Sequence, residues 1–103
     1  MSVDLTIPRE YKRRAEAALP GRIAKVVLFG SRARGEAGGD SDWDIAVFMP
    51  GPITTEERFA LSDVGTSILL DLGQPIQSVP LPLDRESVQT SFMMNLRDDG
   101  IAV

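Results

Sequence analysis

Residues 30–44 read GSRARGEAGGDSDWD and stand between two short apolar runs, VVLF at 26–29 and IAVF at 45–48. Runs of this length, rich in β-branched and aromatic residues, are typical of strands buried in a sheet. A glycine–serine pair follows the first run directly, and two aspartates precede the second. The segment therefore predicts two buried strands, with a small flexible turn brought close to a pair of carboxylates.

The two aspartates, Asp42 and Asp44, lie one residue apart at the start of the second predicted strand, 42–49. Side chains two positions apart in a strand point to the same face, so Trp43 between them should point into the packing on the other face. A carboxylate pair can hold Mg²⁺, which also binds substrate phosphates. We predict a magnesium site at Asp42 and Asp44, although an Asp-x-Asp pattern alone is also common at a solvated strand start.

The glycine–serine pair predicts a turn that binds phosphate. Gly30 has no side chain to keep a phosphate away from the backbone. Ser31 stands where a short helix is expected to begin, so its hydroxyl and the following free amides favour an anion. Arg34, and with less support Arg32, can add positive charge or lie on the surface. We predict a nucleotide site formed by Gly30, Ser31, Arg34 and Ser41.

The composition excludes several kinds of chemistry. The chain has 103 residues, 43% of them hydrophobic and 25% charged, and a net charge of −4, which predicts one globular domain over residues 1–103. It contains no cysteine and no histidine, which excludes thiolate or imidazole metal sites and histidine-based triads. The sequence has no run long enough for a membrane span and no signal-peptide pattern, so we expect a cytoplasmic protein.

Helical spacing predicts three longer helices. The first begins near Pro8. The second opens with a capping box of Thr54 and Glu57 and ends at Gly73, and the third is capped by Asp84 and ends at Gly100. The apolar faces of the second and third are expected to be Leu61, Val64, Ile68 and Leu72, and Val88, Phe92, Met93 and Leu96.

Residues 75–81 predict a third, short strand, and its prolines favour a place at the edge of the sheet. With the short helical piece after Gly30, the elements alternate between helix and strand. The predicted fold class is therefore α/β (α+β), a small mixed three-stranded sheet flanked by about four helices.

The Gly-Ser pair followed after ten residues by Asp-x-Asp resembles the signature of the DNA polymerase β-like nucleotidyltransferases. The chain is similar to their minimal nucleotidyltransferase (MNT) domain, strongly over residues 24–48 and elsewhere by the order and length of its elements. The resemblance implies the nucleotidyltransferase fold and transfer of a nucleoside monophosphate from an NTP to a hydroxyl, with release of pyrophosphate. It also implies that Gly30 and Ser31 bind phosphate and that Asp42 and Asp44 are the catalytic, metal-binding aspartates.

One position departs from the family pattern, which expects a third carboxylate on the next strand. Here residues 75–79 read PIQSV, and Gln77 aligns with the missing acid. A glutamine offers a carbonyl oxygen but neither negative charge nor the basicity that would activate a hydroxyl. The pattern therefore indicates an intact nucleotide site and an incomplete catalytic set.

Stand-alone domains of this size resemble antitoxins whose partners are small all-helical HEPN toxins. The leading hypothesis is an enzyme that transfers AMP from ATP, with Mg²⁺, to a hydroxyl of such a co-encoded partner. The alternative is a catalytically weakened fold that acts as a stoichiometric protein-binding antitoxin. A third hypothesis is a transferase that modifies RNA or a small molecule with the help of a partner subunit. The sequence does not distinguish between nucleotides, acceptors or oligomeric states.

Overall fold

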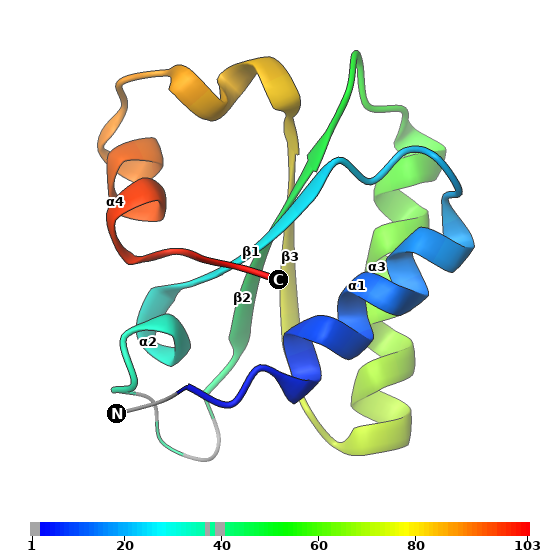
Figure 1. Cartoon of the computed structure of the whole chain (residues 1–103). Coiled ribbons are helices and arrows are strands. Elements are labelled where there is room, and N and C mark those ends of the chain that lie inside the picture. The colour runs from blue at the N-terminus through cyan, green and yellow to red at the C-terminus, as the bar shows by residue number, and fades with distance from the viewer. Residues whose placement is uncertain (1–2, 37, 39–40) are drawn as a thin grey trace.

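Helices and strands alternate along most of the chain, as the computed structural model shows for residues 3–36, 38 and 41–103 (Figure 1). In chain order the elements are α1 (Thr6–Ala18), β1 (Lys25–Phe29), α2 (Gly30–Ala33), β2 (Trp43–Met49), α3 (Thr55–Leu72), β3 (Ile76–Pro82), the 3-10 helix η1 (Leu83–Ser87), α4 (Ser91–Asp99) and β4 (Ile101–Ala102). The mixed α/β fold class is thus confirmed. No helix of the described residues has the length and apolarity needed to cross a membrane.

The strands form one mixed sheet in the order β3-β2-β1-β4, with β3 at an edge as its prolines predict. β2 runs antiparallel to β1 and parallel to β3. The expectation of three strands was wrong, because Ile101 and Ala102 add a fourth strand antiparallel to β1. This strand of two residues is too short for a periodic sequence signal, and it is held by backbone pairing such as the bond from Val103 N–H to the Val26 carbonyl (3.0 Å).

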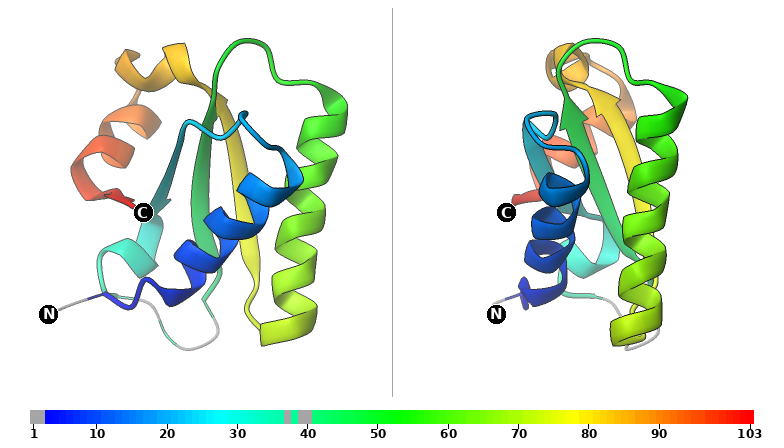
Figure 2. Two further views of the ribbon diagram at one scale, coloured as in Figure 1. Left: turned by 45° about the vertical axis from the view of Figure 1, so that its right-hand side comes forward. Right: turned by 90° about the vertical axis from the view of Figure 1, so that its right-hand side faces the viewer.

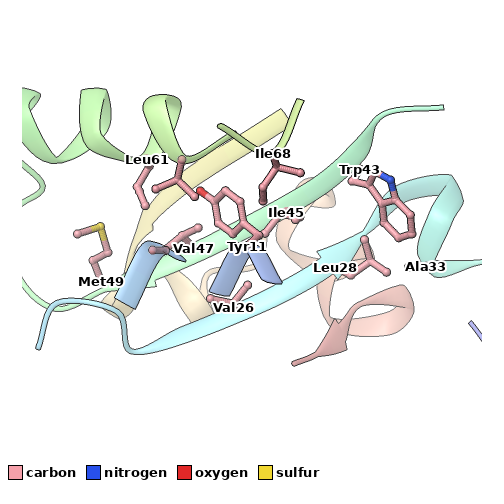
Figure 3. Close-up of a cluster of buried hydrophobic side chains, with 12 residues drawn as sticks. Tyr11, Val26, Leu28, Ala33, Trp43, Ile45, Val47, Met49, Leu61 and Ile68 are labelled. Carbon is pink, nitrogen blue, oxygen red and sulfur yellow. The ribbon is translucent and has the colours of Figure 1, made fainter. Parts of the chain in front are cut away.

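Strand alternation divides the core into two layers on opposite faces of the sheet. Figure 2 shows α1 and α3 on one face of the sheet and α4 on the other. The larger layer packs β1 and β2 against α1 and α3, and it contains Tyr11, Ala15, Val26, Leu28, Ala33, Trp43, Ile45, Val47, Met49, Leu61, Val64 and Ile68 (Figure 3). The smaller layer packs the other face against α4, and it contains Val27, Ala46, Phe48, Met93 and Leu96. Each face of β2 therefore belongs to a different layer.

The ends of α3 follow the sequence signals. The Thr54 hydroxyl accepts the Glu57 N–H (3.1 Å), and the Glu57 carboxylate accepts the Thr54 N–H (3.0 Å), so the predicted capping box forms. Gly73 ends the helix in the left-handed conformation, with φ +68°. Leu72 was wrongly assigned to the buried stripe and is 46% exposed. It is the last residue of α3 and borders an open groove beside the first turns of α1.

The last helix is shorter than the sequence predicts. Asp84 lies in η1, and the cap of α4 is Thr90, whose hydroxyl accepts the Met93 N–H (3.1 Å). Extended backbone at Val88 and Thr90 separates the two helices. Met93 and Leu96 are buried as predicted, whereas Val88 and Phe92 remain 37% and 42% exposed.

Candidate functional site

Gly30 directly follows β1, begins α2 and lies against the carboxylate of Asp44. Its φ of +75° is one that residues with a side chain rarely adopt. A Cβ atom at this position would overlap with Oδ2 of Asp44 and lie 3.2 Å from its Cγ. Glycine is therefore required here both by backbone conformation and by space, because the Asp44 carboxylate occupies the position that a Cβ would take.

Ser31 is half-buried in the first turn of α2, the helix that begins at Gly30. This helix has only four residues, so it adds little dipole. Its first turn nevertheless contains amide groups that have no partner within the helix. An anion next to Gly30 would therefore meet backbone amides and the Ser31 hydroxyl rather than a strong helix dipole.

Asp44 is half-buried on β2, and its side chain lies on the sheet face that packs against α4. Its backbone partners are Phe29 on β1 and Gln77 on β3. Burial raises the pKa of Asp44, the negative charge of Asp42 raises it further, and the charge of Arg34 lowers it. A carboxylate that is costly to keep ionised beside a second carboxylate is stabilised by a bound cation.

Asp42 is exposed and immediately precedes β2, so its charge lies close enough to act on Asp44. Trp43 between them is 5% exposed and packs into the larger core layer, as predicted (Figure 3). Its indole N–H donates to Oε1 of Gln74 (2.8 Å), and its backbone N–H donates to the Pro75 carbonyl (2.9 Å). The buried ring thus fixes the register of the strand that presents Asp44.

Two arginines of the segment take different positions. Arg34 donates to Glu36 (3.1 Å) and lies 3.7 Å from Asp99 at the end of α4, and Glu36 is the main cause of its raised pKa. Arg32 instead donates two hydrogen bonds to the carbonyl oxygen of Ser41, at 2.8 and 3.2 Å. The contact of Arg34 with α4 has no local sequence signal, because Asp99 lies far away along the chain, in the last helix.

Gln77 is exposed on β3, and its Cα is paired with that of Asp44 in the parallel register. Paired residues of adjacent strands point to the same face of a sheet, so Gln77 stands where a third carboxylate would join the pair. Of the other acids near β3, Asp71 forms an ion pair with Arg14 (3.0 Å) and Asp84 lies in η1. The part of the chain that the structure describes contains no group of three or more acidic or other metal-ligating side chains arranged for a metal ion.

The residues present nevertheless fit a hard divalent cation such as Mg²⁺. Two carboxylates supply oxygen ligands, which are the ligands that Mg²⁺ prefers, and the cation completes its shell with water and phosphate oxygens. Burial and the charge of Asp42 raise the pKa of Asp44, and Gly30 allows the backbone of the Gly-Ser turn to lie against this carboxylate. The turn that could bind phosphate is therefore next to a carboxylate that could hold the metal, and the charge of Arg34 acts on the same carboxylate.

Comparison with known proteins identifies the family of the chain. Residues 8–95 match the family model described as "Nucleotidyltransferase domain". Two relatives from Methanocaldococcus jannaschii, both named "Putative protein adenylyltransferase", are 24% identical over 96% of this chain and 97% of the relative (MJ0141) and 30% identical over 89% of each (MJ0604). A solved structure of a tri-AMPylated Shewanella oneidensis HEPN toxin in complex with MNT antitoxin has a similar fold. Its TM-score is 0.61 at 18% identity, over 92% of this chain and 66% of that one.

Proposed function

This chain belongs to the nucleotidyltransferase domain family, and on that premise we propose that it transfers AMP from ATP, with Mg²⁺, to a hydroxyl group of a partner protein. The observation that carries the proposal is the placement of Gly30 against the carboxylate of Asp44, with Asp42 beside it. This arrangement places the Gly-Ser turn, where phosphate would bind, next to two oxygen ligands for the metal.

The choice of AMP and of a protein acceptor is supported by the relatives. Both curated relatives carry the name of a protein adenylyltransferase, and the chain of similar fold comes from a complex that contains an AMPylated HEPN toxin. We therefore propose a small, helical, co-encoded HEPN protein as the partner and an antitoxin role for this chain.

Each site residue has a distinct part in the proposed reaction. Asp42 and Asp44 would hold Mg²⁺, and the ion would supply neutralisation of phosphate charge and polarisation of the phosphorus under attack. Gly30 allows the backbone of the turn to lie close to the Asp44 carboxylate, and Ser31 with the amides of α2 would donate hydrogen bonds to phosphate oxygens. Arg34 exchanges its carboxylate partners for the phosphate chain.

The acceptor oxygen then forms a bond to the α-phosphorus, while the bond from that phosphorus to the bridging oxygen breaks and pyrophosphate leaves. Gln77 can orient the acceptor hydroxyl but cannot take its proton, so the proton passes to solvent. Base catalysis typically contributes about 10²–10⁴-fold, so we expect a slow enzyme rather than an inert one.

A second candidate function is favoured by the same residue. Because Gln77 stands beside Asp44 in place of an acid, the alternative is a module that inhibits the partner by binding alone. In that case complex formation and inhibition would require neither ATP nor the two aspartates.

Calorimetric titration with ATP and Mg²⁺ tests the nucleotide site. We expect binding to the wild type and no measurable binding to the Asp42→Asn, Asp44→Asn double variant, since both metal ligands lose their charge. Omission of Mg²⁺ should have the same effect on the wild type. Equal affinity of the double variant and the wild type would remove the site assignment.

A further inference from the structure

Arg32 connects the Gly-Ser turn with the segment that contains Asp42, although none of the chemistry proposed above uses it. Its guanidinium carbon lies 4.2 Å from the centroid of the Trp43 ring, which is a cation–π distance. Its Nη2 and Nε donate to the carbonyl oxygen of Ser41 at 2.8 and 3.2 Å. One side chain thus holds both the residue before Asp42 and the residue after it.

The position of Arg32 in the sequence makes its contacts with Ser41 and Trp43 important for the site. Arg32 follows Ser31 directly and belongs to α2, the turn proposed to bind phosphate. Ser41 and Trp43 flank the first metal aspartate. A displacement of Arg32 would therefore change the separation between the phosphate turn and the carboxylate of Asp42.

The other contacts of Trp43 make its ring a fixed platform. The ring is buried, its indole N–H is bonded to Gln74, and its backbone N–H is bonded to the Pro75 carbonyl. The ring lies on the face of the sheet that packs against α1 and α3, whereas the side chain of Asp44 lies on the opposite face. The guanidinium of Arg32 stacks on that ring, away from the carboxylate that it would have to approach as a direct phosphate ligand.

We infer that Arg32 is a positioning residue, which sets the separation between the Ser31 turn and the metal aspartates through Ser41 and Trp43. The inference rests on the proposed nucleotide site and adds to it a residue that acts without touching the substrate. Its action depends on the planar guanidinium, because only that group can stack on the indole and donate two hydrogen bonds to one carbonyl. Positive charge alone does not suffice.

The test compares Arg32→Lys, Arg32→Gln and, as a matched control, Arg13→Gln on the exposed side of α1, where the arginine side chain is 67% exposed. Affinity for Mg²⁺–ATP is measured by calorimetry and folding by thermal melting. The emission of Trp43, the single tryptophan of the chain, is recorded with and without Mg²⁺–ATP. We expect both Arg32 variants to bind about 10- to 100-fold more weakly, as a misplacement of up to 1 Å can produce. Their emission should be altered, and Arg13→Gln should match the wild type.

The Arg32→Lys variant keeps the positive charge and therefore distinguishes a positioning role from a purely electrostatic one. Wild-type affinity in Arg32→Lys with weak binding in Arg32→Gln would mean that charge alone matters and would overturn the inference. Lower thermal stability with unchanged affinity in both Arg32 variants would also overturn it, because the role would then be structural. Absence of Mg²⁺–ATP binding in the wild type would instead refute the proposed nucleotide site itself.

Discussion

Gly30→Ala is expected to abolish Mg²⁺–ATP binding. It should lower the free energy of unfolding by little more than an alanine substitution at another glycine of similar positive φ. The glycine has φ +75°, and an L-residue in the left-handed region costs roughly 1–2 kcal/mol. About 0.4–1 kcal/mol of that cost is offset because alanine restricts the unfolded chain. The backbone effect alone therefore lowers the free energy of unfolding by about 1 kcal/mol.

The effect on the site is larger. The new Cβ would overlap with Oδ2 of Asp44, an atom at the end of a short side chain that can rotate away. Rotation relieves the overlap at small cost in stability, but it moves a metal ligand out of position. Binding should fall below detection, since the carboxylate of Asp44 no longer lies beside the Gly-Ser turn.

Gly21→Ala is the matched control. Gly21 has nearly the same φ, +77°, but a Cβ there would have no atom within 4 Å. Urea unfolding should give similar losses of stability for both variants, and calorimetry should show Mg²⁺–ATP binding only in Gly21→Ala. If Gly30→Ala bound as tightly as Gly21→Ala, the contact of Gly30 with Asp44 would not be part of the nucleotide site.

Three further predictions concern stability. Trp43→Ala should lower the free energy of unfolding by roughly 3–5 kcal/mol, because the ring is buried in the larger core layer. A loss under about 1 kcal/mol in urea unfolding would contradict this placement. Asp44→Asn should raise the free energy of unfolding at neutral pH and abolish metal binding, because burial and the charge of Asp42 penalise the ionised carboxylate. A destabilised variant would count against this view of Asp44. The Arg22 hydrogen bond is the main cause that lowers the pKa of Glu57 from 4.5 to about 2. The stabilising effect of this ion pair is therefore complete above pH 4.5 and is lost as the pH falls towards 2. The free energy of unfolding, measured across this pH range, should decline less steeply with falling pH in Glu57→Gln than in the wild type. Identical slopes would show that the ion pair adds nothing to stability.

Much of the fold could be predicted from local patterns. The alternation that buries Trp43 and presents Asp44 follows from the period of a strand, and the capping box of Thr54 needs only residues close in sequence. The placement of Gly30 beside Asp44 also follows from a short reversal between two apolar runs. These features depend on interactions over a few residues or on simple periodicity.

The remaining features depend on contacts that local patterns do not encode. β4 consists of two residues and is held by pairing with β1. The cap of the last helix was assigned to Asp84 because an acid before an apolar stretch is a common signal, but extended backbone after η1 moved the start to Thr90. The contacts of Arg32 with Trp43 and Ser41 form only when the chain has reversed direction between β1 and β2. In the sequence alone, an arginine in such a segment is also compatible with an exposed position.

The most direct test of the proposed transfer is incubation of the protein with labelled ATP, Mg²⁺ and its co-encoded helical partner. Three forms are compared: the wild type, Gln77→Asp, and the Asp42→Asn, Asp44→Asn double variant. Because Gln77 is paired with Asp44 across β2 and β3, restoring the acid should place a base beside the metal site. We predict slow labelling of the partner by the wild type, labelling accelerated by about 10²–10⁴-fold in Gln77→Asp, and none in the double variant. No label from either the wild type or Gln77→Asp, with a tight complex and an inhibited partner, would contradict the transfer and identify a stoichiometric inhibitor.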